Sequence, residues 1–157
     1  MGKGIGNGYP VSVTAFSPGV IDRLGGSQVK YAQSHQNDPL GAAIAREVIR
    51  VIKEEGLIKR SRDIAAMLVS GLEGIKARTD RIKEIRARGL MVALELKDDP
   101  NASYTTRTHR ELVCNGYVLA QRPGLNVLRL DPSLTVERKD IEGFLETFED
   151  LLTTKCT

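Results

Sequence analysis

The residue best suited to covalent chemistry is Lys3, which lies in a glycine-rich segment at the start of the 157-residue chain. Four of the first ten residues are glycine, so the backbone around Lys3 can approach a ligand closely. The segment is neither a Walker loop, since no Ser or Thr follows the Gly-Lys pair, nor a GxGxxG turn. A lysine amine becomes a nucleophile when desolvation or nearby cations lower its pKa. Two interpretations therefore stand for Lys3: a nucleophile beside a ligand, or an ordinary solvated side chain.

Arg129 is the second residue whose setting requires a chemical partner. The alternation around it predicts a strand in which Arg129 shares a face with Leu125 and Val127. A guanidinium among aliphatic side chains needs an anion nearby. The sequence leaves two partners open, which are a carboxylate ligand and a carboxylate of the chain itself in a structural salt bridge.

The other polar candidates carry less chemistry. Ser34 on its own is a hydroxyl that can cap a loop, and we assign no chemistry to His35. His109 falls on the polar face of an expected helix, where we expect it to be solvated. Cys114 and Cys156 lie far apart and near no pair of histidines, which fits neither a zinc site nor a disulfide framework. This cysteine usage indicates a reduced, cytoplasmic protein without a bound metal.

Composition and charge argue against several classes of function. Hydrophobic residues make up 41% of the chain and charged residues 27%, which indicates a globular core. The net charge is only +3, and the basic cluster of Lys59, Arg60 and Arg62 fits a solvated helix face better than a nucleic-acid-binding surface. Since no apolar run is long enough to span a bilayer, we expect neither a nucleic acid nor a membrane as partner.

Hydrophobic periodicity and turn signals predict the elements that would position these residues. The expected order is a strand over 11–16, a short helix over 20–24, a helix from Asp38-Pro39 to Gly56, a helix from about Ser61, a strand over 90–96 and a helix over 105–114. Hairpin strands over 117–121 and 125–130 follow around a turn at Arg122-Pro123-Gly124, and a last helix, capped by Thr135, carries a continuous apolar stripe between Ile141 and Leu152. This order predicts an α+β fold with a small, mainly antiparallel sheet covered on one side by helices.

Four segments together resemble the class III, pyridoxal-phosphate-dependent aminotransferases, which include acetylornithine, ornithine and 4-aminobutyrate aminotransferases. Lys3 to Pro10 resembles the family's Lys-Gly-hydrophobic-Gly-x-Gly-x-Pro segment around the Schiff-base lysine. Ser34 to Leu40 is similar to its Thr-aromatic-x-x-Asn-Pro segment, and Arg86 to Met91 to its Arg-Gly-Arg-Gly-Leu-Met strand entry. Val127 to Leu134 resembles its Val-hydrophobic-Arg-hydrophobic-x-Pro-Pro-Leu strand. These segments follow the family's order and cover essentially the whole chain.

The resemblance implies a fold and a division of the chain. The α+β part would be the small C-terminal domain of a fold-type I transferase, set in the α/β context of that family. Residues 1–37 would be the end of the large cofactor-binding domain, 38–60 the long interdomain helix and 61–157 the small C-terminal domain. We therefore expect a C-terminal fragment of a longer enzyme.

The resemblance also implies roles for three residues. Lys3 would be the catalytic residue that carries pyridoxal 5'-phosphate covalently and later moves the proton as general base. Ser34 matches a threonine whose hydroxyl binds the cofactor phosphate across a dimer interface, which implies a homodimer. Arg129 matches the arginine that binds the substrate carboxylate through a bidentate pair.

The implied function is transfer of an amino group from an amino acid or ω-amine to a 2-oxo acid. In the family, a preceding domain supplies the aspartate at the pyridine nitrogen, the aromatic stacked on the ring and the main phosphate loop. We therefore expect weak or absent cofactor binding, and no transaminase activity, from this fragment alone. The alternatives are a non-catalytic interaction module derived from that family and a module that binds a phosphate ligand through the Gly4–Gly8 loop.

Overall fold

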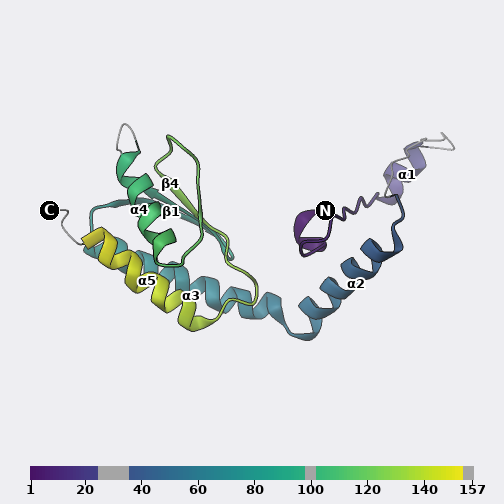
Figure 1. Cartoon of the computed structure of the whole chain (residues 1–157). Coiled ribbons are helices and arrows are strands. Elements are labelled where there is room, and N and C mark those ends of the chain that lie inside the picture. The colour runs from purple at the N-terminus through teal and green to yellow at the C-terminus, as the bar shows by residue number, and fades with distance from the viewer. Residues whose placement is uncertain (25–35, 98–101, 154–157) are drawn as a thin grey trace. The chain divides into compact units, whose positions relative to one another are not determined.

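The computed structural model describes residues 1–24, 36–97 and 102–153, and the chain divides into two compact units, Met1–Gly56 and Leu57–Thr157. The first unit contains η1 (Lys3–Ile5), α1 (Pro18–Leu24) and α2 (Pro39–Glu54). The second contains α3 (Leu57–Arg78), β1 (Ile82–Arg88), β2 (Met91–Leu96), α4 (Ser103–Cys114), β3 (Ala120–Gln121), β4 (Val127–Leu130) and α5 (Arg138–Thr153) (Figure 1). No helix in these described ranges has the length and apolar character needed to cross a membrane.

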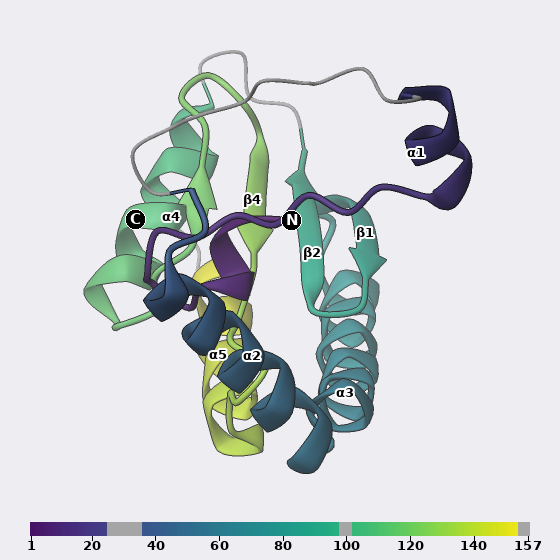
Figure 2. The ribbon, with the colours of Figure 1, turned by 90° about the vertical axis from the view of Figure 1, so that its right-hand side faces the viewer.

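The second unit is built on a four-stranded antiparallel sheet in the order β1-β2-β4-β3 (Figure 2). The sequence predicted only one strand where β1 and β2 form a hairpin. The alternation of β1 is hidden because a bulge at Lys83 places its apolar residues, Ile82 and Ile85, three positions apart. Gly89 has φ 59°, the positive value that the first central position of a two-residue type II′ turn requires.

The core lies between one face of this sheet and the helices of the second unit, as the α+β prediction requires. Val92, Leu94 and Leu96 of β2 are fully buried, as their alternation predicted. They pack in one cluster with residues of α3 and α5 (Figure 1). Among the described residues of this unit, no helix packs on the other, uncovered face of the sheet.

The last helix carries the predicted apolar stripe but not the predicted cap. Phe144 and Phe148 stack with ring centroids 5.6 Å apart, and Tyr117 meets Phe144 edge-on at 5.5 Å. The helix begins at Arg138, and the backbone N–H of Glu137 donates to the Asp140 carboxylate at 3.4 Å. Thr135 lies too early in the chain to cap it, so the Thr135 prediction was wrong.

The N-terminus of α2 matches the sequence prediction. The Asp38 carboxylate accepts a hydrogen bond from the Leu40 backbone N–H at 3.1 Å, and Pro39 occupies the first helical position. Gly56, at φ 61°, separates α2 from α3. The next helix starts at Leu57 rather than near Ser61, because Leu57 is itself buried and the chain re-enters the helix directly after the glycine.

Two expected strand segments differ from the structure. The segment over 11–16 forms no strand. The Val13 N–H donates to the Met1 carbonyl at 2.8 Å, the Met1 amino group donates to the Val13 carbonyl at 2.6 Å, and no longer ladder follows within the described residues. A strand is stable only when a neighbour completes its ladder, so alternation alone over-predicted it. The hairpin around Arg122-Pro123-Gly124 is present, but its strands, β3 and β4, are shorter than expected.

Candidate functional site

Lys3 lies in η1 with its side chain exposed to solvent. Its backbone has φ 52°, a left-handed conformation that costs a non-glycine residue about 1 kcal/mol or more. Within the described residues, its ammonium has no hydrogen-bond or ion-pair partner. A Cβ built on Gly2, Gly4 or Gly8 would meet nothing within 4 Å, so no described residue packs against these three glycines. The segment thus presents an accessible amine on a strained turn.

Gly6 closes this turn and tolerates no side chain. A Cβ there would lie 2.1 Å from the Tyr9 carbonyl oxygen and 2.7 Å from Val11 Cγ1. The Gly6 backbone N–H donates to the Lys3 carbonyl at 2.9 Å, and the Tyr9 N–H donates to the Gly6 carbonyl at 2.9 Å. The glycine predicted to allow close backbone approach is therefore required by the loop's own packing.

Tyr9 connects the glycine-rich turn to the start of α2, a contact that sequence reasoning missed. Its hydroxyl donates a 2.7 Å hydrogen bond to Asp38 Oδ2. That bond, followed by partial burial and the negative charge of Asp38, raises the pKa of Tyr9 above its ordinary value. The sequence identified Asp38 as a helix cap but contained no local signal for a partner 29 residues away.

The sequence also drew attention to Ser34, His35, His109 and Cys114. Ser34 and His35 lie outside the described residues. His109 is half-buried, and its Nε2 lies 2.8 Å from the Leu119 carbonyl oxygen, so the expectation of a solvated side chain was wrong. The cause is the hairpin that folds back alongside α4. Cys114 is exposed, and no cluster of three metal-ligating side chains occurs within the described ranges.

Arg129 lies on β4 with its side chain on the uncovered face of the sheet, paired in register with Ala93 and Ala120. Its Nε donates to Asp131 Oδ2 at 2.6 Å, so the structure shows the internal salt bridge that the sequence had left open. The terminal Nη groups make no hydrogen bond to any described residue. One edge of the guanidinium is held, and the two groups that could grip a carboxylate remain available.

Arg122 is a further basic residue at this place, and sequence reasoning missed it. A depression of about 260 Å³ is lined by Ala120, Arg122, Leu125, Val127 and Arg129. The sequence identified the Arg122-Pro123-Gly124 turn but not the face to which Arg122 belongs. Strand alternation supplies that signal, because Arg122 lies two residues after Ala120, which pairs with Arg129.

The turn that carries Arg122 is well held. The Leu125 N–H donates to the Arg122 carbonyl at 3.1 Å, and Gly124 has φ 75°, as a type II turn with Pro and Gly at its centre requires. The Gln121 amide donates to the Leu125 carbonyl at 3.3 Å and to Thr106 Oγ1 at 3.0 Å. Arg122 therefore projects from a backbone that both the turn and α4 hold in place.

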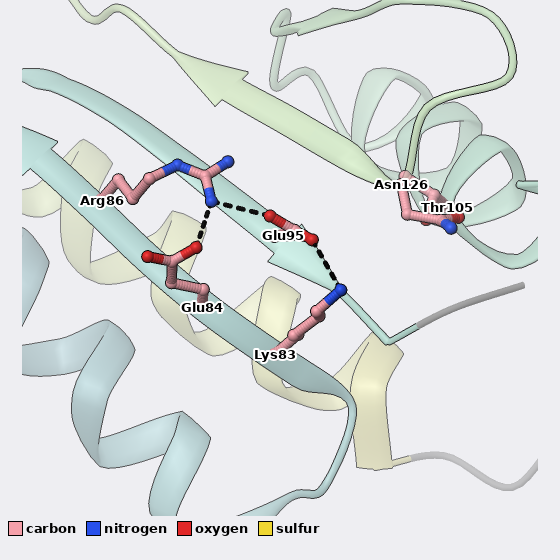
Figure 3. Close-up of polar contacts among 6 residues, drawn as sticks. All are labelled: Lys83, Glu84, Arg86, Glu95, Thr105 and Asn126. Atoms are coloured by element: carbon pink, nitrogen blue, oxygen red, sulfur yellow. Dashed lines mark hydrogen bonds and ion pairs between the residues drawn. The ribbon is translucent and has the colours of Figure 1, made fainter.

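An ionic cluster occupies the same face of the sheet across β1 and β2 (Figure 3). Glu84 and Glu95 face each other in register, an unfavourable pair of like charges. Arg86 offsets this repulsion, because its guanidinium forms ion pairs with Glu84 and, at 2.7 Å, with Glu95. The ammonium of Lys83, the residue at the bulge, lies 2.9 Å from the Glu95 carboxylate. Hydrogen bonds from Arg86 and then Lys83 lower the pKa of Glu95. The cluster is internally compensated, so we interpret it as structural.

The functional groups fall in both units of the chain. The first unit presents the accessible amine of Lys3, and the second presents the guanidinium groups of Arg122 and Arg129 above an apolar floor. An amine can condense with an aldehyde, and guanidinium groups can bind a carboxylate. The roles predicted for Lys3 and Arg129 from the sequence stay predictions, since both side chains are accessible but accessibility does not identify what they bind.

Comparison with known proteins points in one direction. The family model described as aminotransferase class-III matches residues 1–152. The chain is 28% identical over 158 residues to an alanine–glyoxylate aminotransferase 2-like protein of Drosophila melanogaster, covering 96% of this chain and 32% of the relative. It is 32% identical over 145 residues to an ornithine aminotransferase of Bordetella pertussis, covering 90% of this chain and 33% of the relative. The chain thus spans about a third of the length of these relatives.

Solved structures show the same fold. A phospholyase from Arthrobacter in complex with phosphoethanolamine superimposes with a TM-score of 0.88 at 22% identity, covering 99% of this chain and 38% of that one. An acetylornithine aminotransferase from Elizabethkingia anophelis gives a TM-score of 0.69 at 24% identity, covering 79% and 31%. At these identities the likeness concerns the fold alone.

Proposed function

The chain belongs to the class III aminotransferases, and on that premise we propose that it is the carboxy-terminal part of an enzyme that transfers an amino group to a 2-oxo acid. Lys3 is the residue that carries the cofactor in this proposal. The observation that supports it best is the exposed Lys3 amine in a glycine turn that matches the family's lysine motif. An amino acid or ω-amine is the donor, and the enzyme is a cytoplasmic homodimer.

The residues present fit covalent attachment of pyridoxal 5'-phosphate. Bound to an amine, this cofactor supplies an electron sink for charge that develops on the substrate carbon. The Lys3 side chain is exposed, and its amine has no competing carboxylate among the described residues. With the cofactor bound, Lys3 would move the substrate proton as general base, and the Ser34 hydroxyl would donate a hydrogen bond to the cofactor phosphate across the dimer interface. The chain alone binds the cofactor weakly, so excess cofactor and trapping by reduction are needed to detect it.

Arg129 binds the substrate carboxylate in this proposal, and Arg122 supports it from the same depression. Asp131 holds Arg129 through Nε, which leaves both Nη groups free to form a bidentate pair. Arg122 adds positive charge at the rim, and Leu125 and Val127 form an apolar floor for the carbon chain of a substrate. This arrangement favours small amines that also carry a carboxylate.

Borohydride trapping tests the assignment of Lys3. The chain is incubated with pyridoxal 5'-phosphate, reduced, digested and mapped by mass spectrometry. We expect the label on Lys3 to exceed that on Lys53, an exposed lysine of α2. A Lys3→Ala variant should lose the main label, whereas Lys53→Ala should keep it. Equal labelling of all lysines would contradict the proposed role, and transamination by the chain alone would contradict the expected inactivity.

A non-catalytic interaction module is the second candidate, favoured by apolar side chains exposed on the second unit. Met91, Val118 and Leu125 are 55%, 90% and 49% exposed. Exposed apolar surface of this kind can mark a protein contact. Self-association in analytical ultracentrifugation that a Leu125→Ser substitution abolishes, with no preferential label on Lys3, would favour this candidate over the aminotransferase.

A further inference from the structure

A continuous set of hydrogen bonds runs from the backbone of Lys3 to the first turn of α2. The Lys3 carbonyl accepts from the Gly6 N–H, and the Gly6 carbonyl accepts from the Tyr9 N–H, both at 2.9 Å. The Tyr9 hydroxyl donates to Asp38 Oδ2 at 2.7 Å, and Asp38 Oδ1 accepts from the Leu40 N–H at 3.1 Å. The two oxygens of one carboxylate therefore join the turn to the helix.

Close packing accompanies these bonds. A Cβ on Gly41 would lie 3.2 Å from Val11 Cγ2, 3.3 Å from Asp38 Oδ2 and 3.4 Å from Tyr9 Cε1. The small residue in the first turn of α2 thus lets the tyrosine ring and the valine approach the helix backbone. Figure 2 shows this N-terminal segment, in purple, beside the start of α2.

The bond has the features of a charge-assisted contact. The 2.7 Å separation of the two oxygens is typical of a hydroxyl that donates to an ionised carboxylate. Such bonds are stronger than neutral ones and fix both groups. The turn needs such support, because Lys3 adopts a left-handed backbone that a non-glycine residue does not keep without surrounding restraint.

We propose that Tyr9 and Asp38 are positioning residues for Lys3: their hydrogen bond anchors the glycine turn to α2 and maintains the left-handed backbone from which the Lys3 amine projects. This proposal rests on the proposed function only in the claim that the amine so positioned is the one that takes the cofactor. Asp38 then has two tasks, because it caps α2 with one oxygen and anchors Tyr9 with the other.

Substitutions in the full chain separate the anchor from the cap. Tyr9→Phe removes the anchor and leaves the cap, and Asp38→Ala removes both. Asp38→Asn keeps one oxygen that can accept from the Leu40 N–H, and it replaces the oxygen that accepts from the Tyr9 hydroxyl with an amide that cannot accept. Tyr117→Phe is the matched control, since it removes a tyrosine hydroxyl from the second unit. Each variant is compared by the backbone chemical shifts and coupling of Lys3, by amide exchange at Gly6 and Tyr9, and by borohydride-trapped label on Lys3 relative to Lys53.

We expect Tyr9→Phe and Asp38→Ala to speed exchange at Gly6 and Tyr9 by roughly threefold to tenfold. Both substitutions should move the backbone chemical shifts of Lys3 away from those of a left-handed conformation, and both should lower the share of the label on Lys3. The melting temperature of Tyr9→Phe should stay unchanged. Asp38→Asn, which keeps the cap but not the acceptor for Tyr9, should resemble Tyr9→Phe, and Tyr117→Phe should change none of these signals.

Three results would overturn the inference. Unchanged exchange and Lys3 shifts in Tyr9→Phe would show that the turn does not depend on the anchor. A change in Asp38→Ala alone would assign the effect to the helix cap. Faster exchange in Tyr9→Phe with an undiminished label would leave Lys3 reactive without positioning. If Lys3 takes no label in the wild-type chain, the proposed function fails, and exchange and shifts still decide whether the anchor exists.

Discussion

Asp131 lies two residues after Arg129, and this spacing places both side chains on the uncovered face of the sheet. The carboxylate occupies only the Nε edge of the guanidinium, at 2.6 Å. An arginine held in this way loses little further side-chain freedom on binding a carboxylate through its Nη groups. The salt bridge and the ligand site, which the sequence presented as alternatives, are therefore compatible.

Replacing Asp131 tests this orientation. In an Asp131→Ala variant we expect the Arg129 Nε–H to exchange with water several-fold faster, because its acceptor is gone. Side-chain ¹⁵N spectra of the guanidinium groups measure the rate. Glu142→Ala is the control: it removes a carboxylate that lies 3.9 Å from the Arg138 guanidinium, so it should leave the Arg129 signal unchanged. An unaltered rate in Asp131→Ala would mean that the ion pair does not restrain Arg129.

Glu95 makes the stability of the second unit depend on acid. Arg86 and Lys83 lower the pKa of its carboxyl below the ordinary value of 4.5. The pairing therefore stabilises the fold above about pH 4.5 and is lost as the pH falls through the lower folded-state pKa. A Glu95→Gln variant should show a smaller decline of melting temperature between neutral pH and the acid range. Glu142→Gln should follow the wild-type curve, and an identical acid response in Glu95→Gln would refute the pairing.

The packing of α3 against α5 depends at the element scale on a glycine. A Cβ on Gly71 would lie 2.4 Å from Cδ1 and 2.9 Å from Cδ2 of Leu145, so the two helices approach closely at that point. Gly74, one turn later, would meet only Arg78 Nη1 at 3.5 Å, an ordinary contact. The two glycines therefore share a helical setting but differ in what a methyl group would encounter.

Alanine at the two positions should have opposite effects. Gly74→Ala should stabilise the chain by up to about 1 kcal/mol, the helix-propensity gain of alanine over glycine. Gly71→Ala should instead destabilise it by about 1–3 kcal/mol, because Leu145 must leave its rotamer. Urea unfolding of both variants measures the difference. Equal stabilisation by both would show that Leu145 adjusts freely and that Gly71 is not a packing requirement.

At the scale of the whole molecule, stability is concentrated in the second unit. Its core gathers residues from β1, β2, β4, α3, α4 and α5, whereas the first unit buries Ala45 as its one strongly buried hydrophobic residue among those described. A unit with so little buried apolar surface has few contacts to stabilise it. The unit that carries Lys3 thus relies on specific bonds, such as that of Tyr9 to Asp38.

Phe148 tests where the stability lies. The ring is fully buried and stacks on Phe144, so Phe148→Ala should lower the free energy of unfolding by about 3–5 kcal/mol. Phe16 is 58% exposed, and Phe16→Ala should change the free energy of unfolding by less than about 0.5 kcal/mol. Chemical unfolding followed by far-UV circular dichroism compares them. A similar cost for both substitutions would contradict the concentration of the core in the second unit.

Local sequence patterns were sufficient to predict those helices and strands that are determined by residues close together in the sequence. The Asp38-Pro39 pair predicted the start of α2, and the alternation of Val92, Leu94 and Leu96 predicted β2. The continuous apolar stripe along the last helix predicted α5. The lysine motif and the arginine strand likewise identified the family. In each case neighbouring residues determine the outcome, so the signal is present in the chain itself.

Tertiary structure alone decided the rest, because those features join distant residues or depend on a partner strand. The bulge that concealed β1 is defined only by its pairing with β2, and residues 11–16 pair with no strand in the part of the chain that the structure describes. The Tyr9–Asp38 bond spans 29 positions, and Arg122 joins Arg129 only when the hairpin closes. The sequence by itself determined the family and the residues to which a role could be assigned. Folding decided which groups hold those residues in place, since contact in space is not encoded by proximity along the chain.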